Sequence, residues 1–341
     1  MENLIPFSRL AEAGTPGIVL LVAMIVVSIV TLTKGADWLV EGAAQLAYRL
    51  GVSKMIVGAT VVSLGTTSPE TAVSVLAAVQ GQSGFALGNA IGSIICDTGL
   101  IFGLGCVLTR LPKDLFILNR HGWIQFGAGI LIIVMGLLAV LVFGQPVISR
   151  GMGVFLLVLL AGYMAISIRW SKQHNPDSEM VLPVCWKPGF CLLMMLIGVS
   201  IVVVSAQVLI GSTEQIALKL GIPKSVVSAT LVAFGTSLPE LMTALASIRK
   251  GHPEILIGNI IGADILNVLF VTGASATAMA LPIPGEFFYL HFPVMMLVLI
   301  IFRMAIMTRG NTFSRWWGLP LLGIYVTYVL VSYLMRSHFQ P

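Results

Sequence analysis

Two six-residue boxes place a carboxylate and hydroxyl groups inside strongly apolar stretches. Residues 65–70 read GTTSPE and residues 235–240 read GTSLPE, so each position of the first box has a counterpart 170 positions later. Residues four apart share one face of a helix, which puts a threonine beside the glutamate of each box. These pairs are Thr66 with Glu70 and Thr236 with Glu240.

A proline precedes the glutamate of both boxes. Proline lacks a backbone N–H and clashes with the preceding turn, so we expect each helix to break or kink there. Carbonyl oxygens freed inside a membrane must line a cavity or meet another partner, and a cation is one such partner. Ser63 and Ala233, one turn before the threonines, are expected to extend the same faces and to offer backbone carbonyls.

A second motif follows each box at the same 170-residue offset. Residues 88–97 read GNAIGSIICD and residues 258–267 read GNIIGADILN. Polar side chains recur every four positions, and the glycines permit close approach of neighbouring helices. The side chains expected on these faces are Asn89, Ser93 and Asp97 in the first copy, and Asn259, Ala263 and Asn267 in the second.

Together the four faces supply two glutamates, one aspartate, amides and hydroxyls, which is a set of hard oxygen ligands. Calcium takes about six to eight oxygens, and the absence of histidine and thiolate clusters from these motifs argues against zinc or copper. The sequence therefore predicts a site for a hard cation. Asp264, one position after Ala263, is expected to face away from it, toward a neighbouring helix.

Composition places these acids in a membrane. Only 10% of the 341 residues are charged, 57% are hydrophobic and the mean hydropathy is +0.99, whereas a soluble domain has about 25% charged residues. Each acid in the middle of a bilayer costs about 3 kcal/mol, and the only clear base inside a span is Lys34, three residues from Asp37. Protons or bound cations must therefore offset the core acids, whereas Asp37 and Glu41 are expected to serve helix packing.

The apolar stretches predict an all-α membrane protein with ten spans in two five-span repeats. An odd number of spans inverts the second repeat relative to the first. The first repeat is assigned to residues 1–169, a cytoplasmic linker to 170–188 and the second repeat to 189–341. Lys and Arg are concentrated in alternate loops, which favours both termini outside, so the net charge of +5 carries topology information and not a nucleic-acid footprint. The spans are expected near 16–45, 53–80, 84–109, 122–143, 148–168, 190–219, 223–248, 253–280, 286–307 and 315–336.

The paired boxes, each followed by GN-x-x-G, resemble the repeats of the cation/calcium exchanger superfamily, in particular its prokaryotic sodium/calcium exchangers. The resemblance implies an antiporter in a prokaryotic plasma membrane, with Ca²⁺ and Na⁺ as transported ions, no enzyme activity and no cofactor. It also implies a core of eight spans, across which the first and sixth spans slide. It assigns ion binding to Glu70 and Glu240, to Asp97 and Asn267, and to oxygens of Ser63, Thr66, Thr67, Ser93, Ala233, Thr236 and Ser237.

Two positions depart from the family pattern. Asp97 and Asn267 are exchanged relative to the archaeal exchangers, which preserves the total charge. Ala263 stands where a serine is usual, which removes one hydroxyl from an expected sodium position.

Other readings stay open at this point. The carboxylates could carry protons, giving a calcium/proton exchanger, or the exchange could require potassium as well. A passive channel also uses proline-broken helices. Residues 81–84 (GQSG) match the short pattern of an intramembrane serine hydrolase, but no histidine is placed opposite Ser83, and a Gly/Ser turn explains this pattern better.

Overall fold

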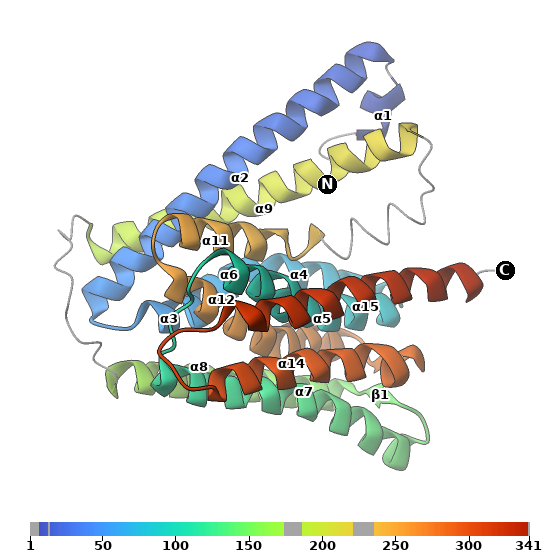
Figure 1. Cartoon of the computed structure of the whole chain (residues 1–341). Coiled ribbons are helices and arrows are strands. Elements are labelled where there is room, and N and C mark those ends of the chain that lie inside the picture. Colours follow the sequence, from blue (N-terminus) through green and yellow to red (C-terminus); the bar gives the residue numbers. More distant parts are fainter. Residues whose placement is uncertain (1–6, 13, 174–185, 221–234, 340–341) are drawn as a thin grey trace.

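The structure, a computed structural model, describes residues 7–12, 14–173, 186–220 and 235–339 of the chain, almost all of them helical. Figure 1 shows α2 and α9 side by side along one face of the helical bundle. The helices α7, α8 and α14 lie on the opposite face, and α4, α5 and α12 lie between these two layers. The helices that carry the two motifs therefore form the middle of the molecule.

The first half of the chain contains α1 to α8. Its elements are α1 (Phe7–Glu12), α2 (Thr15–Leu50), α3 (Lys54–Val57), the π-helix η1 (Gly58–Val62), α4 (Ser63–Val79), α5 (Ser83–Ile95), the π-helix η2 (Cys96–Phe102), α6 (Gly103–Leu108), α7 (Leu115–Phe143), the strand β1 (Val147–Ile148) and α8 (Arg150–Gln173).

The second half repeats much of this order. Its elements are α9 (Pro188–Lys219), α11 (Leu238–Arg249), α12 (Pro253–Leu266), the π-helix η3 (Asn267–Thr272), α13 (Gly273–Ala278), the strand β2 (Leu281–Pro282), the π-helix η4 (Phe287–His291), α14 (Phe292–Met307), the 3₁₀ turn η5 (Arg315–Trp317) and α15 (Gly318–Phe339). The short strands β1 and β2 pair antiparallel and link the two halves at one end of the bundle.

Seven helical segments among the described residues are long and apolar enough to cross a bilayer. They are Thr15–Leu50, Ser83–Leu108, Leu115–Val142, Arg150–Ser171, Pro188–Lys219, Pro253–Ala278 and Phe287–Met307. Each corresponds to one expected span. Two further spans, 53–80 and 315–336, fall on the helical run α3–η1–α4 and on α15, and part of 223–248 lies outside the described residues.

The two prolines behave differently. α4 runs from Ser63 to Val79 with Pro69 inside it, so of the expected break or kink, a break is absent in the first box. Its neighbour Ser68 donates a side-chain hydrogen bond to the Leu64 carbonyl on the exposed face of this helix, a type of bond that often accompanies a bend. In the other box the chain forms a turn, and α11 begins at Leu238 with Pro239 in its first turn, where a missing N–H costs nothing.

α12 is the central helix, and every residue from Ile255 to Leu266 is buried. Glycine permits this, because a Cβ on Gly258 would lie 2.0 Å from the Met55 carbonyl oxygen. A Cβ on Gly262 would lie 2.5 Å from both the Ala59 carbonyl oxygen and Ser63 Oγ. The backbone of α12 therefore packs directly on η1, and the two halves of the chain meet at the residues of the motifs.

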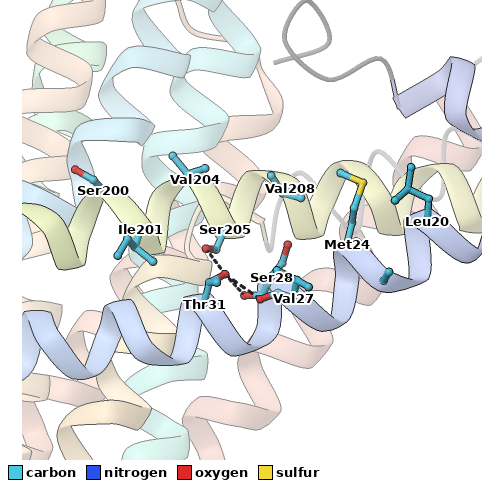
Figure 2. A pocket seen from close by; sticks show the side chains of 11 residues that line it. Leu20, Met24, Val27, Ser28, Thr31, Ser200, Ile201, Val204, Ser205 and Val208 are labelled. Atoms are coloured by element: carbon cyan, nitrogen blue, oxygen red, sulfur yellow. Dashed lines mark hydrogen bonds between the residues drawn. The ribbon is translucent and has the colours of Figure 1, made fainter.

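α2 and α9 form a long antiparallel pair (Figure 1). Their backbones come close together at Gly35 and Gly198, where a Cβ on Gly35 would lie 3.0 Å from the Gly198 carbonyl oxygen. Between their apolar faces lies a groove of about 580 Å³, in which Thr31 Oγ1 and Ser205 Oγ are 2.7 Å apart (Figure 2). The pair is tied to the core at one end, because Arg249 of α11 forms an ion pair with Asp37 of α2. Lys250 pairs with Glu41 one turn further along α2 at 3.2 Å, as expected for acids that serve helix packing.

Candidate ion-binding site

The acids of the two boxes are brought together in the centre of the bundle. Glu70 on α4 and Glu240 on α11 are both fully buried, and they lie close enough for their charges to repel one another. Asp97, in the first turn of η2, is also fully buried and within the field of both glutamates. Residues far apart in the sequence thus form one carboxyl cluster, in which the two glutamates are adjacent and Asp97 lies within reach of their charges.

Hydroxyl groups from both halves line this cluster. Ser93 Oγ donates a hydrogen bond of 3.0 Å to Glu70 Oε1, and Ser237 Oγ lies 3.3 Å from Ser93 Oγ. Thr66, one turn before Glu70, faces Glu240 across the interface. The same threonine also lies 3.4 Å from Asn259 Oδ1. Ser93 and Ser237 therefore connect α5 with the turn before α11.

The remaining predicted residues have no hydrogen bond to the carboxyl groups of the cluster within the described part of the chain. Ser63, Thr67 and Asn267 are buried. Ser63 donates to the Thr60 carbonyl, whereas Thr67 Oγ1 and both polar atoms of Asn267 have no hydrogen-bond partner among the described residues. Thr236 is partly exposed. Ala233, expected to offer a carbonyl, lies outside the described residues.

Several buried oxygens of the cluster lack hydrogen-bond donors. Both oxygens of Glu240, both of Asp97 and Oε2 of Glu70 have no hydrogen-bond partner among the described residues. Buried polar atoms are normally satisfied, and a buried charge without a partner is strongly unfavourable. This arrangement fits a group of oxygens that binds a cation.

A structural salt-bridge role for these acids is not supported. The two buried cations of the described chain, Lys113 and Arg303, are engaged elsewhere: Lys113 Nζ donates to the Ala305 carbonyl at 2.7 Å, and Arg303 binds Asn119 Oδ1 at 3.0 Å. The ion pairs found in the described ranges join α11 to α2, outside the cluster. No cation of the described ranges is therefore available to neutralise the cluster, which leaves this role open to an ion from solution.

The donor set is one for a hard cation. Within the described residues, no three or more His, Cys, Asp or Glu side chains are grouped as ligands of a metal ion. Two glutamates with hydroxyl, amide and carbonyl oxygens suit calcium or sodium better than a transition metal.

Local helix geometry repeats with the motif. The π-helix η2 begins at Cys96 with Asp97 in its first turn, and η3 begins at Asn267, the counterpart of Asp97. π-helical turns interrupt the regular hydrogen-bond ladder and occur frequently at functional sites. Both halves thus place the last residue of the second motif where the helix changes its winding.

A cavity of about 370 Å³ borders the cluster on the side of α9. It is lined by Pro69, Thr236 and Pro239 from the boxes and by α9 residues that include Gln207 and Glu214. Thr236, the partly exposed member of the predicted set, faces this space. The cavity therefore adjoins the two boxes on the side of α9.

Some polar contacts were not predicted from the motifs. Asn89 donates to Ser74 Oγ at 2.9 Å, which fixes α5 against α4. Gln125 of α7 donates to Asp264 Oδ2 at 2.6 Å, so Asp264 does face a neighbouring helix. Ser74 and Gln125 lie outside the repeated motifs. The only sequence feature that could have indicated the contact of Gln125 is that it is a single amide side chain in the otherwise apolar stretch 122–143.

Comparison with known proteins agrees with this architecture. The family model described as "Sodium/calcium exchanger protein" matches residues 20–169 and 190–334. The sodium/calcium exchanger MaX1 of Methanosarcina acetivorans is 28% identical, over 91% of this chain and 97% of its own. The inner membrane protein YrbG of Escherichia coli is 31% identical, over 91% of this chain and 96% of its own length.

A solved structure has the same fold. The sodium/calcium exchanger from Methanococcus jannaschii superposes with a TM-score of 0.78 at 28% identity, covering 92% of this chain and 98% of that chain. Because the family model matches most of the sequence and the structure agrees over the same length, this chain belongs to the sodium/calcium exchanger family of membrane transporters.

Proposed function

We propose that this chain exchanges Ca²⁺ for Na⁺ across a membrane by alternating access, with Glu70 and Glu240 as the carboxylates that both ions share. The observation that carries the proposal is the pair of buried glutamates, one from each motif copy, with no cation of the described residues paired to them. Their two charges balance one Ca²⁺, and Na⁺ binding to the same oxygens would displace it.

The other predicted residues complete the site in this proposal. Ser93, Ser237 and Thr66 contact the carboxylate cluster, and Asp97 adds a third carboxyl group. Backbone or side-chain oxygens of Ser63, Thr67, Thr236, Ala233 and Asn267 are the further ligands.

Charge explains why the transport is an exchange. The empty site holds at least two uncompensated charges, which are costly to enclose away from water. A loaded site is close to neutral and can be occluded. The protein therefore changes between its inward-open and outward-open conformations only with ions bound. The export of one kind of ion is thereby coupled to the import of the other.

The proposed topology has ten spans in two inverted repeats, residues 1–169 and 189–341, joined by a cytoplasmic linker at 170–188. Both termini lie outside a prokaryotic inner membrane. The equal offset of the motifs, the matching starts of η2 and η3, and the inner-membrane relative support this arrangement. The α2–α9 pair is the moving element, because it packs on the core over one face only.

Transport of ⁴⁵Ca²⁺ into proteoliposomes tests the function directly. A sodium gradient should drive uptake, whereas potassium or pH gradients of the same size should drive little. Glu240→Gln should abolish sodium-driven uptake, and Glu254→Gln, at the loop end of α12, is the matched control. Normal exchange by Glu240→Gln protein, or uptake driven equally by a pH gradient, would contradict the proposal.

A further inference from the structure

Asp264 is a fourth buried carboxyl group of the core, and the ion site described above does not use it. It lies on α12 and is 2% exposed. Its Oδ2 accepts hydrogen bonds from Thr98 Oγ1 at 2.5 Å and from Gln125 Nε2 at 2.6 Å. Its Oδ1 is buried and has no hydrogen-bond partner among the described residues. Oδ2 is therefore held by two donors from separate elements, η2 and α7, whereas Oδ1 accepts no hydrogen bond from the described residues.

This cluster has no counterpart in the other half of the chain. The 170-residue offset puts Ile94 opposite Asp264 and Val268 opposite Thr98. Every polar side chain in the predicted ion site comes from a motif position present in both copies. Asp264 with Thr98 and Gln125 is thus an addition to one half only and lies outside the repeated ion site.

The charges around Asp264 are negative. Asp97 on η2 lies within its electrostatic field, and Glu70 on α4 and Glu240 on α11 lie beyond Asp97. On α7, one turn from Gln125, the buried His121 pairs with Tyr163 of α8 at 3.0 Å. The other charged groups on elements packed against α12 are engaged elsewhere or lie apart from Asp264: Arg120 of α7 lies over the Phe116 ring, and Lys34, Asp37, Glu41, Arg49, Lys54, Arg249 and Lys250 belong to α2, α3 and the end of α11. No described base therefore contacts Asp264.

We propose that Asp264, held by Thr98 and Gln125, is a separate binding position for one exchangeable proton, and that its occupancy sets the affinity of the central site for cations. The proton comes from water and adds to Oδ1, which turns the carboxylate into a neutral acid with no other bond changed. The core then loses one negative charge, and cations in the central site are held less tightly.

A proton fits this position better than a metal ion. The two donors, a hydroxyl and an amide N–H, already point at Oδ2 with their hydrogens, so they do not present oxygens to a cation. Sodium or calcium needs several oxygen ligands, whereas a proton needs only the bare Oδ1. The geometry thus selects the smallest cation.

Asp264→Asn is the central test, because the amide oxygen can still accept from Thr98 and Gln125 while the charge and the proton are lost. In wild-type proteoliposomes, the apparent KM for Ca²⁺ should rise as pH falls. The variant should show a KM about tenfold higher at alkaline pH, the effect of one charge across a helix-to-helix distance of about 10 Å. A plot of the apparent KM for Ca²⁺ against pH should also lack, in this variant, the transition that Asp264 produces in the wild type. An unchanged pH profile would overturn the proposal.

Two threonine variants separate proton binding from simple packing. Thr98→Val removes one donor to the carboxylate, so the protonated form should persist to higher pH and the KM profile should shift upward in pH. Thr98→Ser keeps the hydroxyl and should behave as wild type. Equal profiles for Thr98→Val and Thr98→Ser would show that the cluster only packs the helices, which contradicts the proposal.

Infrared difference spectra of the purified protein give a readout that does not depend on transport. A pH step should change one protonated-carboxyl band in the wild type that is missing in Asp264→Asn. The inference rests on the proposed exchange only for its KM measurement. Glu70→Gln protein, expected to lose transport, should keep this band. If the band responds to Na⁺ or K⁺ at fixed pH and not to pH, the bound ion is a metal and the proton assignment is wrong.

Discussion

Ser93 donates a 3.0 Å hydrogen bond to Glu70, whereas Ala263, its counterpart in the second motif copy, has no hydroxyl to give Glu240. Both oxygens of Glu240 are without a hydrogen-bond partner in the described structure. The two shared carboxylates are therefore unequal, although the boxes that carry them are nearly the same. Glu70 is held by a serine hydroxyl, whereas Glu240, among the described hydroxyls, has only Thr66 facing it.

Ser93→Ala should weaken calcium binding. A hydrogen bond to a charged group contributes about 1.5–3 kcal/mol, so we expect the apparent KM for Ca²⁺ to rise by about tenfold or more. Sodium-driven ⁴⁵Ca²⁺ uptake into proteoliposomes measures this. Ser68→Ala, on the exposed face of α4, removes a hydroxyl outside the cluster and should leave the KM unchanged. An equal KM for both variants would show that Ser93 does not orient Glu70.

Ala263→Ser should restore the missing oxygen. A hydroxyl at this position would approach Glu240 as Ser93 approaches Glu70, so less Na⁺ should be needed to half-saturate exchange. The Na⁺ dependence of ⁴⁵Ca²⁺ release is the measurement. Ala263→Cys adds a similar volume without an oxygen and controls for packing around this fully buried residue. If serine and cysteine have the same effect, volume and not the hydroxyl is responsible.

The repeated boxes predicted the core of this site because their chemistry is unusual for a membrane. Carboxylates in apolar stretches that contain no basic residues need a cation or a proton to neutralise them. The constant offset of 170 residues indicated that the two glutamates occupy equivalent positions in the two halves of the chain. The structure does place Glu70 and Glu240 together. Asp97 joined them because it lies on the same helical face as Ser93.

The local consequences of the sequence were harder to predict. Pro69 and Pro239 stand in nearly the same box, yet α4 continues through the first proline and α11 begins at the second. From a proline in the sequence one can predict only which backbone hydrogen bond is missing. Whether the helix ends there depends on how it packs against its neighbours. The contact of Asp264 with Gln125 likewise depends on which face of α7 packs on α12, and the uniform apolar sequence of α7 does not reveal this face.

Gly262→Ala should destabilise the protein, because its Cβ would lie 2.5 Å from the Ala59 carbonyl oxygen and from Ser63 Oγ. Overpacking of this kind typically costs about 1–3 kcal/mol, so α12 and η1 should separate and the melting temperature should fall. Gly92→Ala is the matched control: it is the counterpart 170 positions earlier, and a Cβ there would meet no neighbouring atom of the described structure within 4 Å. Equal melting temperatures for the two variants in detergent would contradict the close contact of the two halves.

Cysteine crosslinks test which helices move together during transport. In a background without native cysteines, cysteines at Asp37 and Arg249 can be bridged by a reducible bifunctional thiol reagent that spans the length of the observed ion pair, which joins α2 to the core. If the α2–α9 pair slides over the core, this bridge should stop ⁴⁵Ca²⁺ exchange and its reduction should restore it. Cysteines at Thr31 and Ser205, whose hydroxyls are 2.7 Å apart, would join α2 to α9 instead. This second crosslink should leave exchange largely intact, because it links two helices that move as one. Full activity with α2 crosslinked to α11 would show that α2 stays fixed on the core, and that another element opens the site.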